Sequence, residues 1–536
     1  MMGNNWQQGP FRIPTFKDFV PHNVRFTLLI VFACCFQLSG GVYLAAMNQL
    51  VGCKTLLQED VMMAAYASFI GLTVTFSLLF RVKFRFKSRN IIMTAAVVIA
   101  VGNLVILTCN NLVIIMATSF VIGMCRLFGT FECMSTLQGK LAPNHDQTIF
   151  FCVLFCIILS AIQLSGIATV YLDFFYNWRY MHLFIAALLL AVTLTAALLM
   201  KDIRLTDKYP LSGIDWAGFA LWSLFLLSSS YTLLYGKHFE WFESQYICTG
   251  TAVAVISLLL AIRRMLTAEQ PYFSPEIFGY KGFKSSLLLI MTMSLLLATP
   301  NTVEGVMTGG ILHFPSISTI SLNWVVLVGG FCGSLFSFYT LAIRKMFYKW
   351  IIFTGFACLV GYQAIMYFLI DTRTALEMFY VPLFLRGAGY TTLFVTLTLY
   401  SIKNIPFKYF LQPVGILGFI RTGAGTAAAA AIVANLMNYL MKENCMNQGW
   451  ELDAVNSVAA AMHSGALYGE LAKQALMVSA KQIMGWFTIF GIFVLAAIPG
   501  MRYIRPVMRS MPKMKQYRKI ARKLYKLRRL DGENDN

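Results

Sequence analysis

Long apolar runs separated by short polar stretches dominate this chain. Each run approaches the ~20 residues that an α-helix needs to cross the ~30 Å hydrocarbon core of a bilayer. The pattern predicts an all-α polytopic membrane protein with roughly fourteen transmembrane helices. The apolar runs cover residues 26–51, 61–80, 91–109, 112–137, 148–173, 180–200, 213–235, 245–262, 285–312, 320–343, 350–370, 376–401, 410–441 and 480–501.

The two longest runs, 285–312 and 410–441, exceed one membrane thickness, so we expect each to be kinked, tilted or broken. The first contains the stretch ATPNTVEG, whose proline cannot continue a regular helix without losing a hydrogen bond. The polar to mildly amphipathic stretch 442–479 follows the second run, and we expect one or two short helices there outside the membrane.

Composition supports a lipid environment. The chain has 536 residues, of which 58% are hydrophobic and 12% charged, and its mean hydropathy is +0.67. Soluble domains carry about 25% charged residues. No Walker loop, metal-ligand spacing or Ser-His-Asp set is visible, so we expect no metal, no cofactor and no enzymatic activity.

The net charge of +20 follows the membrane topology. Lysine and arginine accumulate in cytoplasmic loops, and an even number of spans puts both termini on one side. With both termini in the cytoplasm, the inner segments include 81–90, 201–208, 344–349 and the basic tail, and they hold most of the basic residues. The charge therefore indicates orientation and contact of the tail with the anionic bilayer surface, and no nucleic-acid partner is expected.

A weak internal repeat relates the two halves of the chain. Arg126 is followed by Gly129 and a loop containing GKLAP, and Arg386 is followed by Gly389 and a loop containing IKNIPFK. Internal repeats of this kind are typical of secondary transporters, in which the binding site lies between the repeats near the membrane midplane.

Several stretches resemble the major facilitator superfamily, and specifically its 14-span drug:proton antiporters of the EmrB/QacA type. The resemblance covers nearly the whole chain, and the central stretch 213–264 is its most specific part. The structural-motif residues that carry it are Gly129, Trp178, Arg179, Gly387, Gly389, Gly423 and Gly425. The stretches are NWRYMHLF (177–184), GIDWAGFALWSLFLLSSSYTLLYGKHFEWFES (213–244), PYFSPEIFGYKGF (271–283), LFLRGAGYTTLFVTL (383–397) and FIRTGAGTAAAAA (419–431).

Three family motifs are altered. The loop after the second span reads LLFRVKFRFKSRN and lacks the expected acid; Phe84 stands in its place. The span-5 antiporter motif aligns with residues 165–170, which have no proline and one glycine. The first span, CFQLSGGVYLAAMNQL, lacks the aspartate that the family carries. These changes leave the implied fold unaffected, and they weaken the implication of proton-driven antiport.

The resemblance implies a definite domain organisation. It consists of a cytoplasmic N-terminus (1–25), an N-terminal six-helix bundle (26–200), two inserted transmembrane helices (213–264), a C-terminal six-helix bundle (284–503) with the extracytoplasmic loop 442–479, and a basic cytoplasmic tail (504–536).

The resemblance also implies alternating-access export of a hydrophobic or cationic small molecule, driven by the proton gradient across the inner membrane of a bacterium. A periplasmic adaptor protein and an outer-membrane channel are the implied partners, with loop 442–479 as the docking surface. Two alternatives stay open: an exporter or uniporter of a specific lipid or metabolite without proton antiport, and a non-transporting membrane sensor or scaffold.

Ionisable groups inside a bilayer cost several kcal/mol and therefore mark functional positions. Five such residues are candidates for proton coupling or cavity charge: Arg126, Glu132, Glu304, Arg386 and Arg421. At ~100° per residue, Arg126 and Glu132 differ by about 240° around one helix, so they cannot face the same point. Glu132 is either a structural or gating ion-pair partner for the basic 81–90 loop or a proton carrier. Glu304 is either a substrate or proton site beside a broken helix or a hydrated residue at the outer mouth.

Polar and aromatic residues inside the spans complete the candidate cavity. Most polar side chains in such bundles hold helices together, so each is a weak signal by itself. The substrate-cavity candidates are Tyr43, Gln163, Asn301, Tyr362, Gln363 and Tyr390.

Overall fold

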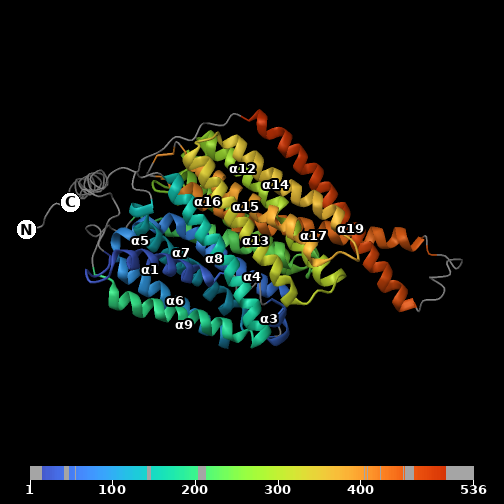
Figure 1. The fold of residues 1–536 in the computed structure, drawn as a ribbon, viewed down its shortest axis with the longest axis horizontal. Coiled ribbons are helices and arrows are strands. Elements are labelled where there is room, and N and C mark those ends of the chain that lie inside the picture. Colours follow the sequence, from blue (N-terminus) through green and yellow to red (C-terminus); the bar gives the residue numbers. More distant parts are fainter. Residues whose placement is uncertain are drawn as a thin grey trace, which may run out of the picture.

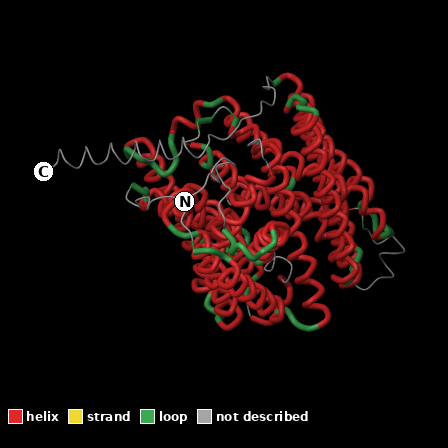
Figure 2. Tube along the Cα trace, turned by 60° about the vertical axis from the view of Figure 1, so that its left-hand side comes forward, coloured by secondary structure: helices red, strands yellow, loops and turns green. Residues whose placement is uncertain are grey.

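The computed structural model describes residues 15–40, 47–54, 56–141, 147–202, 213–403, 405–406, 409–422, 424–450, 452 and 464–501. These residues are almost entirely helical, as Figure 2 shows. The strand-like pairing among them is a single bridge between Phe16 and Met200. The prediction of an all-α fold is confirmed.

The apolar runs of the sequence become long helices. The α-helices are α1 (His22–Leu38), α3 (Met47–Lys54), α4 (Gln58–Val74), α5 (Leu79–Arg85), α6 (Ser88–Thr108), α7 (Leu112–Leu141), α8 (Gln147–Phe175), α9 (Arg179–Leu199), α10 (Trp216–Tyr235), α11 (Gln245–Thr267), α12 (Lys281–Leu296), α13 (Ser316–Ser337), α14 (Tyr348–Leu369), α15 (Tyr380–Ile402), α16 (Gln412–Thr422), α17 (Ala424–Trp450) and α19 (Ser464–Ala497).

Within the described residues, eleven helices are long and apolar enough to cross a membrane. The shorter helix α1, the interrupted segment that begins with α12 and the helix α15 are not among these eleven. The α15 helix is buried against other helices along most of its length, so it does not need an apolar surface toward lipid. The number fourteen stays a prediction.

The two halves of the chain form two groups of helices (Figure 1). Helices α1 to α9 gather in the lower part of this view, and helices α12 to α19 lie above them and to their right. The halves meet where α8 packs on α13 and where α4 packs on α16. Helix α10 packs on both α4 and α17, so the α10–α11 pair bridges the two halves on one side.

Each half contains helices in glycine-mediated contact. In the N-terminal half, a Cβ on Gly123 of α7 would overlap the Ser68 carbonyl of α4. In the C-terminal half, a Cβ on Gly387 of α15 would overlap the Val326 carbonyl of α13. Small residues allow helix backbones to approach closely in a membrane, where van der Waals packing drives association.

The basic loops of the N-terminal half lie at one end of the helices, which we call the basic face. Lys87 at the start of α6 forms an ion pair with Asp202 after α9. Lys201 donates to Asp18 over 2.6 Å, and this hydrogen bond, with the lysine charge, lowers the pKa of the Asp18 carboxyl. The segment before α1 is therefore attached to the basic face.

The C-terminal half also ends at the basic face. The Lys403 ammonium after α15 lies 5.1 Å from the centre of the Tyr348 ring at the start of α14. Helix α19 runs antiparallel to α14, with Gly491 against Val360, so its end near Ile498 lies beside the start of α14. Both ends of the described chain therefore lie at the basic face.

Helix α12 is interrupted at the position that its proline predicts. It continues as two π-helical turns, η5 (Pro300–Glu304) and η6 (Val306–Ile311). Proline lacks an N–H and its ring displaces the carbonyl four residues earlier, here Leu296. The Gln363 side chain of α14 donates to that carbonyl over 2.8 Å. A neighbouring helix thus satisfies the backbone group that Pro300 leaves without a helical partner.

The stretch 442–479 is formed by continuations of long helices in its described parts. Helix α17 runs on to Trp450, and α19 already begins at Ser464. Asn444 of α17 donates to Ser479 and Gln482 of α19, over 2.9 and 3.0 Å. These residues extend two spanning helices instead of forming separate short helices, and they project beyond the bundle at the right of Figure 1.

Candidate functional site

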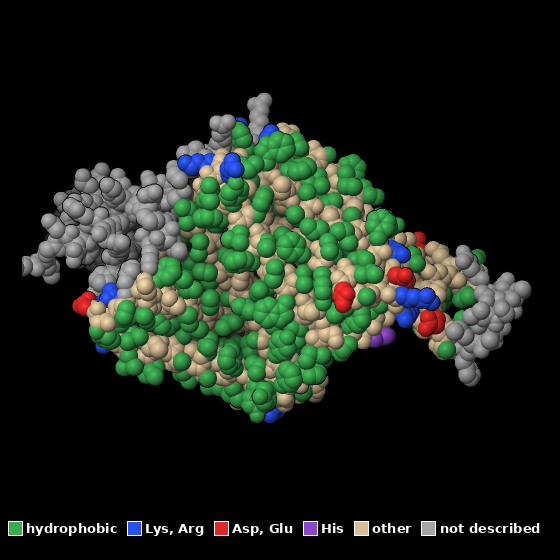
Figure 3. Space-filling view, in the orientation of Figure 1, with side chains coloured by type: hydrophobic (Ala, Val, Ile, Leu, Met, Phe, Trp, Pro, Cys, Tyr) green, Lys and Arg blue, Asp and Glu red, His purple; other side chains and the backbone are tan. Residues whose placement is uncertain are grey.

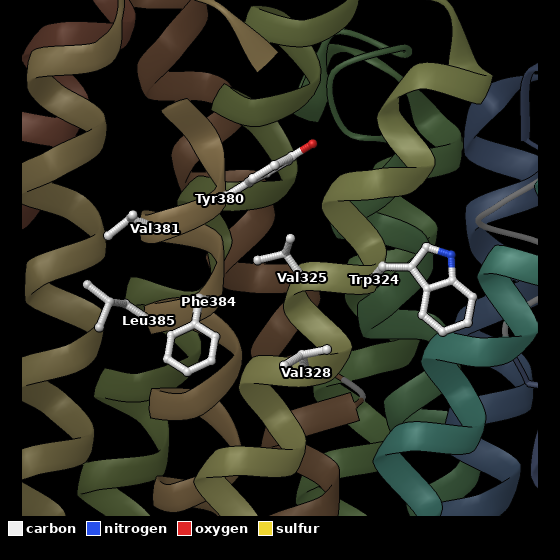
Figure 4. A pocket seen from close by; sticks show the side chains of 7 residues that line it. All are labelled: Trp324, Val325, Val328, Tyr380, Val381, Phe384 and Leu385. Carbon is white, nitrogen blue, oxygen red and sulfur yellow. The ribbon is translucent and has the colours of Figure 1, made fainter. Parts of the chain in front are cut away.

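The outer surface of the bundle is mostly apolar. In Figure 3, hydrophobic side chains cover the middle of the visible face, and most charged ones lie toward its two ends. A groove of about 460 Å³ on the outside of the bundle is lined by α13 and α15 residues, none of which is an acid or a base. Figure 4 shows the side chains that line it. Because Trp324, Val328 and Val381 in it are exposed on the outside of the bundle, we look for chemistry in the interior.

Arg126 of α7 is fully buried and donates to two neutral side chains. Its guanidinium donates to Gln37 Oε1 of α1 over 3.1 Å and to Ser68 Oγ of α4 over 3.2 Å. The Gln37 amide in turn donates to Thr130 Oγ1 over 2.7 Å. Gly40 faces the guanidinium, because a Cβ there would overlap it. The arginine therefore joins three helices of the N-terminal half.

Glu132, also on α7, faces a different neighbour. The Lys83 ammonium of α5 donates to both carboxylate oxygens over 3.1 Å and to the Ser135 hydroxyl over 2.5 Å. Both side chains of the pair are 2% exposed, and Lys83 lies 5.7 Å from the centre of the Phe131 ring. This geometry matches a structural ion pair with the basic 81–90 loop, and its role in transport stays a prediction.

Glu304 lies at the centre of a second ion pair in the C-terminal half. Arg386 Nη1 of α15 donates to both Glu304 oxygens over 2.5 Å, and the Tyr362 hydroxyl of α14 donates to Oε1 over 2.6 Å. The glutamate is 20% exposed and the arginine 18%. Arg386 is six residues from the start of α15, about 9 Å along it, so the pair lies nearer the face opposite the basic face.

Arg421 of α16 forms a fourth cluster, with aromatic residues of α15. Its Nε donates to the Tyr390 hydroxyl over 2.8 Å, and its guanidinium carbon lies 3.9 Å from the centre of the Phe394 ring. Arg386, Tyr390 and Phe394 follow each other at intervals of four residues, so they form one face of α15. We call these three residues the α15 ladder. It connects the Glu304 ion pair with the Arg421 cluster.

The structure thus separates the predicted charges into four clusters. Glu304, Arg386 and Tyr362 meet, Arg421 meets Tyr390, and Arg126 and Glu132 have different partners. Gln363 supports the break in α12. Gln163 is half-buried on α8, and its side chain has no hydrogen bond within the described chain. Tyr43, Gly423 and the Asn301 side chain lie outside the described residues.

The predicted structural-motif residues have packing contacts. Trp178 is buried, with the Lys54 ammonium 5.4 Å from its ring centre, and the exposed Arg179 guanidinium lies 5.7 Å from it. The remaining glycines each lie where a Cβ would crowd a neighbour. Those neighbours are the Phe36 ring for Gly129, the Gly355 carbonyl for Gly389 and the Ile420 carbonyl for Gly425.

Three site residues were not identified from the sequence. Gln37 is a polar residue in the middle of the first apolar run, and that position was the available signal. Lys83 lies in the basic loop, but no pattern distinguishes it from its basic neighbours. Phe394 is one of 44 phenylalanines, and only its contact with Arg421 identifies it. In the described residues, no three His, Cys, Asp or Glu side chains lie together as metal ligands would.

The comparisons with known proteins concern the fold. No protein-family model matches this chain, and no curated protein matches it in sequence. Solved transporter structures do match its fold. An auto-inhibited POT family peptide transporter shares 12% identity with a TM-score of 0.54, over 91% of this chain and 98% of the other.

Two further structures agree with this one. A peptide transporter POT in complex with sulfate shares 12% identity with a TM-score of 0.55, over 93% and 99% of the two chains. The proton:xylose symporter XylE of the major facilitator superfamily shares 11% identity with a TM-score of 0.50, over 92% and 98%. Likeness at this identity establishes the fold alone. The chain therefore has the fold of major facilitator transporters.

Proposed function

We propose that this protein is a secondary active transporter that moves a small molecule across a membrane by alternating access and couples this movement to protons through Glu304. The observation that carries the proposal is the cluster of Glu304, Arg386 and Tyr362 beside the π-helical break in α12. A carboxylate inside a membrane bundle is costly unless it is paired, and such residues mark proton and ion pathways.

The physical basis is a change of charge at a contact between helices. The ionised Glu304 attracts Arg386 and so links the α12 segment to α15. Protonation removes the negative charge and weakens this link. The difference in stability between the two protonation states shifts the balance between conformations that open to opposite sides. The pair is not fully enclosed by the bundle, since the Glu304 side chain is 20% exposed and that of Arg386 18%.

The fold supports the transport part of the proposal. Two helix groups that meet along α8–α13 and α4–α16 can rock about these contacts. Since lysine and arginine favour the cytoplasmic side, we place the basic face in the cytoplasm. Export of hydrophobic molecules, with an adaptor partner at the 442–479 region, is the finer proposal that follows from the sequence resemblance.

The test uses inverted membrane vesicles with an imposed pH gradient and a panel of fluorescent dyes. We expect gradient-driven uptake that a protonophore abolishes. Glu304→Gln should reduce this uptake more than tenfold and leave gradient-independent exchange of the same dye. Glu377→Gln is the matched control, because Glu377 is an exposed acid at the same end of the bundle. Uptake that depends on the gradient equally in wild type and Glu304→Gln would exclude Glu304 as the coupling acid.

A further inference from the structure

The residues of the Arg421 cluster have no part in the proton coupling proposed for Glu304. Arg421 comes from α16, while Tyr390 and Phe394 come from α15. The Phe394 ring is in edge contact with Phe155 of α8, at a centroid distance of 4.5 Å. The cluster therefore joins both halves of the chain, at a position where a ligand would touch helices that move relative to each other.

The guanidinium points into the bundle. Phe419, two residues earlier on α16, packs outward against Trp222 of α10 and Phe273, with ring centroids 5.9 and 5.2 Å apart. At ~100° per residue, Arg421 lies about 160° away from Phe419, on the side that faces α15. It is nine residues from Gln412, the start of α16 near the basic face, or about 14 Å along the helix. This depth is close to half of the ~30 Å hydrocarbon core.

The charge of Arg421 is not balanced by a described carboxylate. Its hydrogen-bond partner in the described chain is a neutral phenol, and its remaining contacts are aromatic rings. Arg386, one turn beyond Tyr390, has Glu304 as its counter-ion. An arginine at membrane depth without a nearby anion is unfavourable, and a ligand that supplies the anion removes this cost.

We propose that Arg421, Tyr390 and Phe394, with Phe155 opposite them, form the substrate subsite, and that the substrate is an amphipathic organic anion. A carboxylate or sulfonate would accept hydrogen bonds from the free face of the guanidinium, whose planar fork suits such groups. An aromatic or alkyl body would lie against the phenylalanine rings. This proposal rests on the proposed transport function and replaces the cationic substrate that the sequence resemblance implies.

The proposal also explains why the proton site lies on the same helix face. Glu304 binds Arg386 at one end of the α15 ladder, and the anion would bind at Tyr390 and Phe394, one to two turns away. A new negative charge near Arg421 disfavours ionised Glu304 through like-charge repulsion and favours its protonated form. Occupancy of the anion site and the protonation of Glu304 would therefore be thermodynamically linked.

The test measures binding to the purified full-length protein in neutral detergent by isothermal titration calorimetry. The probes are naphthalene-2-sulfonate and its cationic counterpart 2-naphthylmethylammonium, which share an aromatic body and differ in charge. We expect the anion to bind at least tenfold more tightly than the cation. Arg421→Met should remove this preference, and Arg421→Lys should retain part of it because the positive charge remains.

Arg344→Met is the matched control. Arg344 also donates from Nε to a tyrosine, Tyr339, over 2.7 Å, with its guanidinium 5.5 Å from that ring, but it is exposed at the basic face. This change should leave anion binding unchanged. Folding of each variant is checked by size-exclusion elution and by the thermal unfolding midpoint, so that loss of binding is separated from loss of structure.

Each outcome decides the proposal. Equal binding of anion and cation, or an anion preference that survives Arg421→Met in a folded protein, would overturn it. Displacement of the sulfonate probe by anionic phospholipid but not by other organic anions would also overturn it, because the site would then belong to lipid. Anion binding that depends on Arg421, together with no pH-driven uptake in vesicles, would retain the subsite and reject the proposed function.

Discussion

Each half of this protein has an arginine three residues before a glycine on a tightly packed helix. The groups that surround the arginine differ between the halves. Arg126 is fully buried and donates to the neutral side chains of Gln37 and Ser68. Arg386 is 18% exposed and bound by the carboxylate of Glu304. In the first site the arginine donates to an amide oxygen and a hydroxyl, and in the second it donates to a carboxylate.

The paired acids of the two halves differ in how far their side chains are exposed. Glu132 is 2% exposed and has a lysine on both oxygens, and it lies near the basic face. Glu304 is 20% exposed and lies nearer the opposite face. A fully buried pair is suited to fixing helices, since breaking it leaves an uncompensated charge. A partly exposed pair is suited to exchange of protons. We therefore propose that the N-terminal pair fixes helices and that the C-terminal pair exchanges protons.

The largest expected loss of stability comes from breaking the Lys83–Glu132 pair. Lys83→Met leaves Glu132 buried without its counter-ion and should lower the free energy of unfolding by about 3 to 5 kcal/mol. The double change Lys83→Met/Glu132→Gln should recover most of this loss, because no charge remains. Unfolding in mixed micelles with increasing SDS measures both. A double variant no more stable than the single one would contradict a pair that acts through charge.

Breaking the Arg386–Glu304 pair should lower stability less than breaking the Lys83–Glu132 pair, and it should reduce transport more. Arg386→Met should cost about 2 kcal/mol, less than the buried pair, because water can solvate the remaining carboxylate. Gradient-driven uptake should fall at least tenfold. The same SDS unfolding and vesicle uptake compare Arg386→Met with Lys83→Met. The contrast between the halves fails if Arg386→Met destabilises the protein as much as Lys83→Met does.

The glycine contacts test whether the halves are alike in packing while they differ in charge. Gly123→Ala and Gly387→Ala each place a methyl group against a backbone carbonyl of the neighbouring helix. Each should cost about 1 to 2 kcal/mol through overpacking. Gly305→Ala is the control, because nothing lies within 4 Å of its Cβ position. Thermal unfolding midpoints of the three variants should separate the two contact glycines from the control.

The smallest expected effect concerns the neutral network around Arg126. Thr130→Val removes the acceptor of the Gln37 amide hydrogen bond, which is 2.7 Å long. The loss should be about 1 kcal/mol, typical of one neutral hydrogen bond. Thr94→Val, which removes the hydroxyl of an exposed threonine bonded to its own helix, should change the midpoint less. A pH-dependent effect of Thr130→Val on uptake would show that the N-terminal site also takes part in coupling.

Much of this architecture could be predicted from the sequence because lipid leaves a chain few choices. A backbone in hydrocarbon must satisfy its own hydrogen bonds, so an apolar run of about 20 residues becomes a helix. The break after α12 was predicted for the same reason, since Pro300 removes one of those bonds. That Arg126 and Glu132 face different directions followed from helix geometry alone.

Partners across helices could not be predicted in this way. That Lys83, among several basic residues in 81–90, pairs with Glu132 depends on how α5 turns against α7. That Gln363 supports the break in α12 depends on the packing of α14. These contacts join residues 49 and 67 positions apart, and no local pattern contains their distance.

The sequence by itself determined that this protein is a membrane bundle of apolar helices, that its basic loops share one end of the bundle, and which few charges the bundle contains. The reason is that solvent, helix period and charge cost act residue by residue. Only the tertiary structure decided which charges meet. It placed Glu304 on Arg386, gave Arg421 aromatic neighbours instead of an acid, and aligned both along one face of α15, because contacts between helices depend on the packing of the whole bundle.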